Sequence, residues 1–253
     1  MRLILILPLL ALLGGCLSAG GKYGADARWP TGGQAWQAAR DAALEPGTWV
    51  PVVATGVLMI DNADGHLTDW AMRHQPVFGS NADDDSNVLQ KATAGFWLLT
   101  ALAAPSETLG DKVAGLSSGL AAVALEGAVS TGLKEISGRE RPNRRNDKSF
   151  PSGHAGRTSA LATLTAYNVN AMNLSEPARL GAIAGAQLLA AGTAWARVEA
   201  GKHHVSDVLV GNALGHFIGA FVRNAFLPEG EGRINIGYVP MDGGGALTLS
   251  LLH

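Results

Sequence analysis

The chain has 253 residues, with 19 Lys and Arg against 21 Asp and Glu, so its formal net charge is -2. Apolar residues make up 47% of the chain and charged residues only 16%, whereas soluble proteins average about 25% charged residues. The small net charge argues against a nucleic-acid-binding protein, which would carry a basic excess.

The N-terminus has the order of a secretory signal. Arg2 is followed by an apolar run and then by small residues that lead to Cys16. This order predicts a signal peptide over residues 1–15, and "LLGGC" resembles a bacterial lipobox, whose cysteine becomes the lipidated first residue. Cys16 is the only cysteine and cannot form an intramolecular disulfide, so lipidation explains it better than redox chemistry. An uncleaved membrane anchor is the alternative.

Such a lipoprotein would be located in the cell envelope and would face the periplasm. Leu17 follows the cysteine where an Asp would indicate retention at the inner membrane, so the outer membrane is favoured. We interpret residues 16–47, rich in Gly, Ala and Gln, as a lipid-attached tether that contains one short helix around 34–44.

The next segments are an apolar stretch at 49–60 and a polar stretch at 61–87 that is rich in turn-forming residues. "DNADGH" in the polar stretch resembles a calcium loop. Its Gly comes at the fifth position rather than the sixth, and Ala63 occupies a ligand position, so we expect no metal there. The acidic stretch 82–86 is either a solvated loop or a helix start.

Five helices are predicted in the rest of the chain, at 88–105, 112–140, 153–172, 176–198 and 205–226. The second ends before Pro142, because a residue that precedes proline avoids the helical region. Glycines recur at four-residue spacing, which would let helix backbones pack closely; they are Gly115 and Gly119, Gly181 and Gly185, and Gly211, Gly215 and Gly219. The sequence therefore predicts an all-α helical bundle over residues 48–227.

A membrane-spanning helix needs about 20 apolar residues. Three segments approach this length, but they contain Glu126, Gln187, and His216 with Arg223. We therefore favour a bundle held at a membrane by its lipid, with an integral inner-membrane protein as the alternative.

The tail at 228–253 differs from the rest. It has strand-forming residues on both sides of "DGGG", which predicts a β-hairpin. Because an isolated two-stranded hairpin is marginally stable, we expect it to pack on the bundle or to pair with something else.

Three short stretches concentrate the reactive side chains. "KEISGRERP" holds Lys134 and Arg141, whose seven-residue spacing would place both on one face of a helix. "PSGH" lies at the start of a predicted helix, where the backbone N–H groups of Ser152 and Gly153 could bind an anion. These groups suit the oxygens of a phosphate.

The third stretch, "ARVEAGKHHVSD", adds a further cation, Arg197, and two groups with a chemical role. His203 and Asp207 are four residues apart, on one face of a helix. Asp207 could hold one ring nitrogen of His203 and leave the other to attack. His154 could then protonate the leaving oxygen, so that a phosphate ester could be hydrolysed without a metal cluster.

The three stretches resemble the signature of the type 2 phosphatidic acid phosphatase family, which is shared with bacterial class A acid phosphatases and vanadium haloperoxidases. The signature reads K-x6-R-P, P-S-G-H and S-R-x5-H-x3-D. The resemblance implies an all-helical core over 48–227 that needs no cofactor. It implies phosphate binding by Lys134, Arg141, Ser152, Gly153 and Arg197. It also implies that His154 is the general acid and that His203 forms a phosphohistidine with the help of Asp207.

The chain departs from the family pattern in two places. Ala196 stands where the family usually has Ser, and only eight residues separate Pro142 from Pro151, which puts a substrate-contacting insert in doubt. Of two neighbouring histidines, only His203 fits both spacings, and His204 does not. Further cations surround the motifs and would add positive potential or coat the surface: Arg139, Arg144, Arg145, Lys148 and Arg157.

The resemblance implies a phosphatase that acts on a phosphate monoester or a pyrophosphate, and the predicted anchor favours a lipid substrate. Two alternatives stay open. The same residues can hold vanadate, as in a vanadate-dependent haloperoxidase. The chain could also be a non-catalytic envelope lipoprotein, a scaffold with the tail hairpin as its partner surface.

Overall fold

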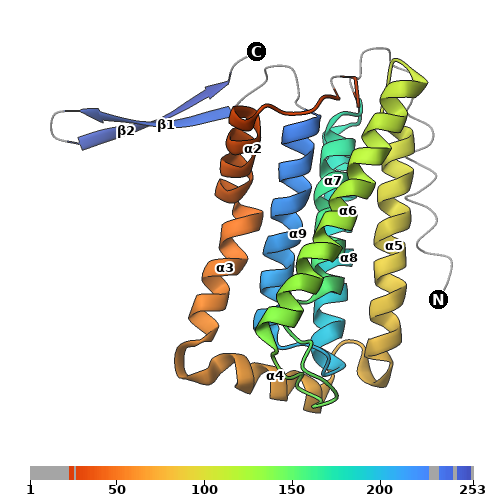
Figure 1. The fold of residues 1–253 in the computed structure, drawn as a ribbon, viewed down its shortest axis with the longest axis vertical. Coiled ribbons are helices and arrows are strands. Elements are labelled where there is room, and N and C mark those ends of the chain that lie inside the picture. Colours follow the sequence, from red (N-terminus) through yellow and green to blue (C-terminus); the bar gives the residue numbers. More distant parts are fainter. Residues whose placement is uncertain (1–22, 26, 228–233, 242–243, 252–253) are drawn as a thin grey trace.

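The computed structural model describes residues 23–25, 27–227, 234–241 and 244–251. Within these residues the chain forms a bundle of long helices, with one helix lying across one end and a hairpin at the side (Figure 1). The predicted signal peptide at 1–15 and Cys16 lie outside the described residues.

The elements follow one another in this order: α2 (Gly32–Leu44), α3 (Pro46–Leu58), η1 (Ile60–Asn62), α4 (Ala63–His74), η2 (Gly79–Asn81), α5 (Ala82–Ala103), α6 (Leu109–Ser137), α7 (Gly153–Asn170), α8 (Glu176–Glu199), α9 (Val205–Phe226), β1 (Ile234–Met241) and β2 (Gly244–Leu251).

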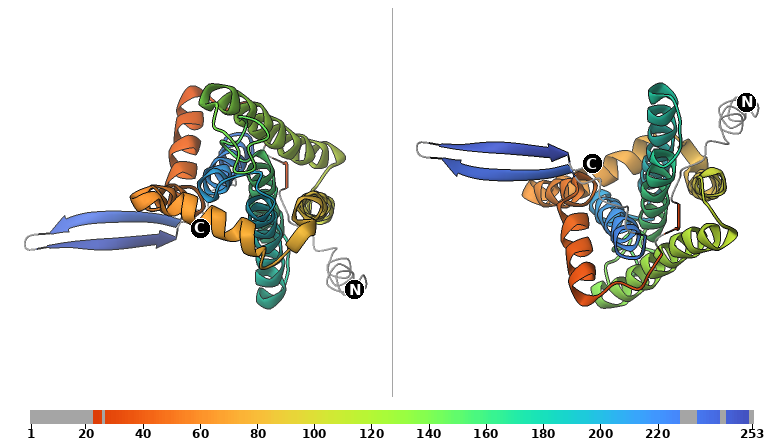
Figure 2. Two further views of the ribbon diagram at one scale, coloured as in Figure 1. Left: turned by 90° about the horizontal axis from the view of Figure 1, so that it is seen from below. Right: turned by 90° about the horizontal axis from the view of Figure 1, so that it is seen from above.

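Helices α7 and α9 form the centre of the bundle, as the end-on views show (Figure 2). Helix α7 contacts α5, α6, α8 and α9, and α9 also contacts α2 and α3. A Cβ on Gly211 would lie 2.5 Å from the carbonyl oxygen of Ser152, and one on Gly215 would lie 2.0 Å from that of Gly156. The prediction that this glycine row permits close backbone packing is confirmed. Gly181 and Gly185, by contrast, face open space.

Three predicted boundaries differ from the observed ones. The stretch 61–87, which we expected to be turns, contains α4, and α5 begins at Ala82 rather than at 88. The first turn of α5 contains Asp83, Asp84 and Asp85, whose carboxylates complement the positive end of the helix dipole. Helix α6 ends at Ser137 rather than at 140, because Gly138 adopts the left-handed conformation that closes a helix.

The helix expected within the tether is part of the bundle. Thr31 begins it with a capping box, in which its side chain accepts a hydrogen bond from the N–H of Gln34. Helix α2 then packs against α9, so residues 32–44 belong to the packed structure.

Strands β1 and β2 pair antiparallel, with Ile234 opposite Leu251 and Met241 opposite Gly244, which confirms the predicted hairpin. All views place it at the side of the bundle, pointing away from the helices (Figures 1 and 2).

The tight contact between α7 and α9 predicts how glycine substitutions change the stability of the fold. Gly215→Ala should lower the thermal unfolding temperature, because the new methyl meets backbone that cannot rotate away, and overpacking costs about 1–3 kcal/mol. Gly185→Ala is the matched control on α8. It has open space and should stabilise the helix by roughly 0.5–1 kcal/mol. Circular dichroism measures both, and equal stability of the two variants would contradict the packing argument.

Candidate active site

Four helix ends bring the three reactive stretches together. The C-terminal ends of α6 and α8 and the N-terminal ends of α7 and α9 lie at the same end of the bundle, beside α4 (Figure 1). Lys134 lies near the end of α6, and Ser152 caps the start of α7. Arg197 lies in the last turn of α8, and Asp207 lies in the first turn of α9.

Two predicted site residues come from loops rather than from helices. Because α6 ends at Ser137, Arg141 lies in the following loop and does not share a helix face with Lys134. Lys134 Nζ instead donates a hydrogen bond to the carbonyl oxygen of Pro151, which ties α6 to the segment before α7. His203 precedes α9 in the turn after α8, where it is only 2% exposed.

The hydrogen bond to His203 defines which ring nitrogen can react. Its Nδ1 lies 2.5 Å from the carbonyl oxygen of Ser149. A carbonyl oxygen can only accept, so Nδ1 carries the proton and Nε2 keeps its lone pair. Asp207 Oδ2 lies 3.8 Å from Nδ1, beyond hydrogen-bond distance. The expected direct hydrogen bond is therefore absent, and Asp207 reaches His203 through Ser149, whose Oγ donates to Oδ2 at 2.5 Å.

A network that the sequence did not reveal holds Asp207 in place. Arg139 Nη1 donates to Asp207 Oδ1 at 2.6 Å, and Arg139 Nη2 donates to Asp64 Oδ2 at 2.8 Å. Asp64 belongs to α4 and also accepts from the backbone N–H and the hydroxyl of Ser206. The Asp64–Arg139–Asp207 network thus joins α4, the loop after α6 and the start of α9.

The two site arginines have unused donors. Arg141 Nε and Arg197 Nε are both buried without a hydrogen-bond partner among the residues that the structure describes. Arg197 is 5% exposed, and its Nη1 donates to Asp83 Oδ1 at 2.6 Å and to Ser86 Oγ at 3.1 Å. An unsatisfied buried donor costs free energy. An anion with several acceptor oxygens would satisfy these groups.

Both site histidines are held in the neutral form. Burial, with the positive charge of Arg197, lowers the pKa of His154 to about 3, and burial lowers the pKa of His203 to about 4. His154 Nε2 lies 3.0 Å from Asn87 Oδ1 on α5. Neutral His203 can attack as a nucleophile. His154 would need to gain a proton to act as an acid, and a bound anion would raise its pKa.

Metal ligands do not gather at this site. In the described part of the chain, no group of three or more His, Cys, Asp and Glu side chains could hold a metal ion.

Comparisons with known proteins agree with the architecture. The sequence model of the PAP2 superfamily matches residues 115–230, which include all three reactive stretches. No curated protein matches the chain. The structure is similar to that of the first transmembrane PAP2 type phosphatidylglycerolphosphate phosphatase from Bacillus subtilis. The TM-score is 0.54 and the identity is 19%, over 70% of this chain and 92% of that one. The likeness confirms the predicted all-α bundle.

The lowered histidine pKa values predict how stability depends on pH. Between about pH 6.5 and 4, the unfolded chain binds protons at His203 and His154 that the folded chain does not. The free energy of unfolding should therefore fall as the pH falls through this interval, by at most about 1.4 kcal/mol per pH unit for each histidine. His203→Asn should make the slope shallower in denaturant titrations. An unchanged slope would mean that His203 has the same pKa in the folded and the unfolded chain.

Proposed function

We propose that this chain, which belongs to the PAP2 superfamily, is a phosphatase that hydrolyses a phosphate monoester or pyrophosphate of a lipid. The observation that supports this most directly is the pair of buried Nε–H groups of Arg141 and Arg197, which have no acceptor among the described residues, together with the tautomer that leaves a lone pair on Nε2 of His203. The structural neighbour is itself described as a phosphatidylglycerolphosphate phosphatase.

The proposed reaction has two steps. Nε2 of His203 attacks phosphorus and forms an N–P bond, while the P–O bond to the leaving group breaks and its oxygen takes a proton from His154. Water then attacks the phosphohistidine, the N–P bond breaks, and His154 accepts the proton of that water. Phosphate leaves, and both histidines return to their states in the substrate complex, in which His203 is neutral and His154 has taken up a proton from solvent on binding of the anionic substrate.

Positive charge would stabilise the transferring phosphoryl group. Lys134, Arg141 and Arg197 would bind its oxygens, as would Ser152 and the backbone N–H of Gly153 at the positive end of α7. Such groups stabilise charge that spreads over the oxygens in the transition state. Ser149 would hold His203 in its reactive tautomer, and Asp207 would stabilise the positive charge that develops on the ring.

The surface of the bundle supports a lipid substrate and membrane association. Helices α3, α5 and α6 expose large apolar side chains, such as Val53, Leu102 and Leu120. In the described chain, α6 and α9 are long and apolar enough to cross a membrane, but most of α9 is buried inside the protein. The apolar surface of α3, α5 and α6 would therefore contact the membrane. The lipid that we propose on Cys16 would be a second membrane attachment.

The nucleophile is tested by replacing His203. His203→Ala should lower kcat by about 10³-fold or more, because the variant lacks the nitrogen that would form the N–P bond. His204→Ala is the matched control and should reduce kcat much less. Phosphate release from p-nitrophenyl phosphate and from phosphatidic acid measures turnover, and thermal unfolding checks the fold. Near-normal activity of His203→Ala would refute the assignment.

The lipid anchor is tested by Cys16→Ser. This change should abolish incorporation of radiolabelled palmitate and processing at residue 16, since lipid transfer needs the thiol. Phosphatase activity of the solubilised protein should stay unchanged. Labelling that persists in the variant would rule out the anchor.

A further inference from the structure

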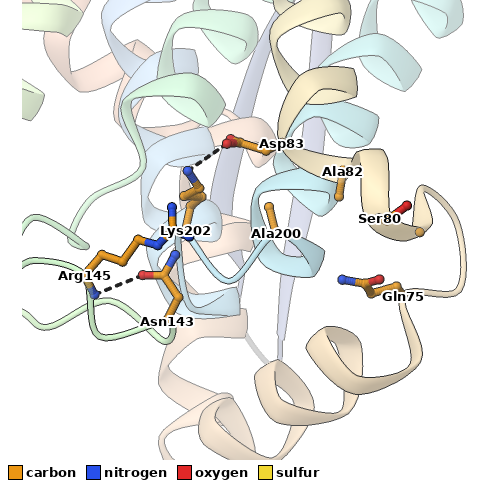
Figure 3. Close-up of a pocket in the computed structure, with 9 residues that line it drawn as sticks. Gln75, Ser80, Ala82, Asp83, Asn143, Arg145, Ala200 and Lys202 are labelled. Atoms are coloured by element: carbon orange, nitrogen blue, oxygen red, sulfur yellow. Dashed lines mark hydrogen bonds and ion pairs between the residues drawn. The ribbon is translucent and has the colours of Figure 1, made fainter.

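A polar cleft adjoins the proposed phosphate site on the side of α5. Its volume is about 250 Å³, below the roughly 300–1,000 Å³ of pockets that hold whole drug-sized ligands. It therefore suits one chemical group rather than a whole substrate. Figure 3 shows the polar side chains around it: Gln75, Ser80, Asp83, Asn143, Arg145 and Lys202.

A single carboxylate connects the cleft to the phosphate site. Asp83 Oδ1 lies 2.6 Å from Arg197 Nη1, and its Oδ2 lies 2.7 Å from Lys202 Nζ. The Asp83 carboxylate therefore bridges Lys202 and Arg197, a proposed phosphate-binding residue. Lys202 also directly precedes His203 in the chain. Asp83 accepts from Nη1 of Arg197, and Nε has no partner among the described residues, so a phosphate can bind Arg197 while Asp83 stays in place.

The cleft has an excess of positive charge. Burial alone would raise the pKa of Asp83, but its contacts with Lys202 and Arg197 hold it below the usual value. Arg145 extends toward Lys202 (Figure 3) and makes no ion pair within the described residues. Lys148 in the same loop, by contrast, pairs with Glu135 at 2.6 Å. Arg145 and Lys202 line the same cleft, and an anion bound between them would offset their mutual repulsion.

We propose that this cleft binds a second anionic group of the substrate, beside the phosphate that Arg197 holds. The inference rests on the proposed function, because it takes Arg197 as a ligand of the reacting phosphate. Lys202 and Arg145 supply the charge, and the side-chain amides of Asn143 and Gln75 supply hydrogen-bond donors. The substrates favoured have two anionic phosphorus groups, either adjacent, as in a lipid diphosphate, or separated by a short linker, as across a glycerol.

Non-hydrolysable phosphonates test the cleft by calorimetry on the full chain. Methylenediphosphonate represents adjacent groups, propane-1,3-diphosphonate represents separated groups, and propylphosphonate has a single group. At least one diphosphonate should bind about tenfold or more tightly than propylphosphonate, and the better one identifies the spacing. Arg145→Gln should remove this advantage and leave propylphosphonate binding within about twofold. Arg144→Gln, in the same loop but outside the cleft lining, should change neither.

The outcomes separate the two proposals. If propylphosphonate binds and phosphate monoesters are hydrolysed, but neither diphosphonate binds more tightly, the subsite is wrong and the phosphatase function stands. The subsite is also wrong if Arg145→Gln weakens all three ligands equally or none of them. If the chain neither binds propylphosphonate nor hydrolyses any phosphate ester, both proposals fail.

Discussion

The site depends on the backbone contact between the first turns of α7 and α9. The N–H of Ser152 donates to the carbonyl oxygen of Asp207 at 3.0 Å. Gly211 and Gly215 allow the two helices to meet without side chains between them. Since Ser152 caps α7 and His203 lies two residues before the start of α9, this contact sets the distance between the proposed anion-binding helix start and the proposed nucleophile. Any residue that forced the two helices apart would separate the two halves of the site.

Burying charge at this junction requires partners from several elements. Asp207 is fully buried and has three donors, namely Ser149 Oγ, Arg139 Nη1 and the N–H of His204. A buried carboxylate without such partners would cost several kcal/mol. Asp64 of α4 forms an ion pair with Nη2 of Arg139. This ion pair attaches the loop after α6 to α4, which lies across this end of the bundle.

The sequence predicts candidate site residues from residue types and spacing, but it does not predict the contacts that these residues make. The motif residues could be found because reactive side chains recur at set spacings in an otherwise apolar chain. The Asp64–Arg139 ion pair could not, because 75 residues separate its members and no local pattern joins them. The hydrogen-bond acceptor for His203 is a backbone carbonyl. Every residue has such a group, so the sequence does not identify which one is used. The seven-residue spacing predicts Arg141 on a helix, whereas Gly138 closes α6 before that residue.

The neutral state of the histidines links the chemistry to the charge of the substrate. Neutral His203 is in the form that the proposed attack requires, but His154 has a pKa of about 3 and lacks the proton that the proposed general acid must donate. Burial and the nearby positive charges of Arg197 and Arg157 cause this lowering, and an anion bound among them would offset it. Each negative charge that enters the site therefore favours the protonated form of His154. A substrate with a second anionic group beside Lys202 would bring more of that charge, so binding and activation of the acid would favour the same substrates.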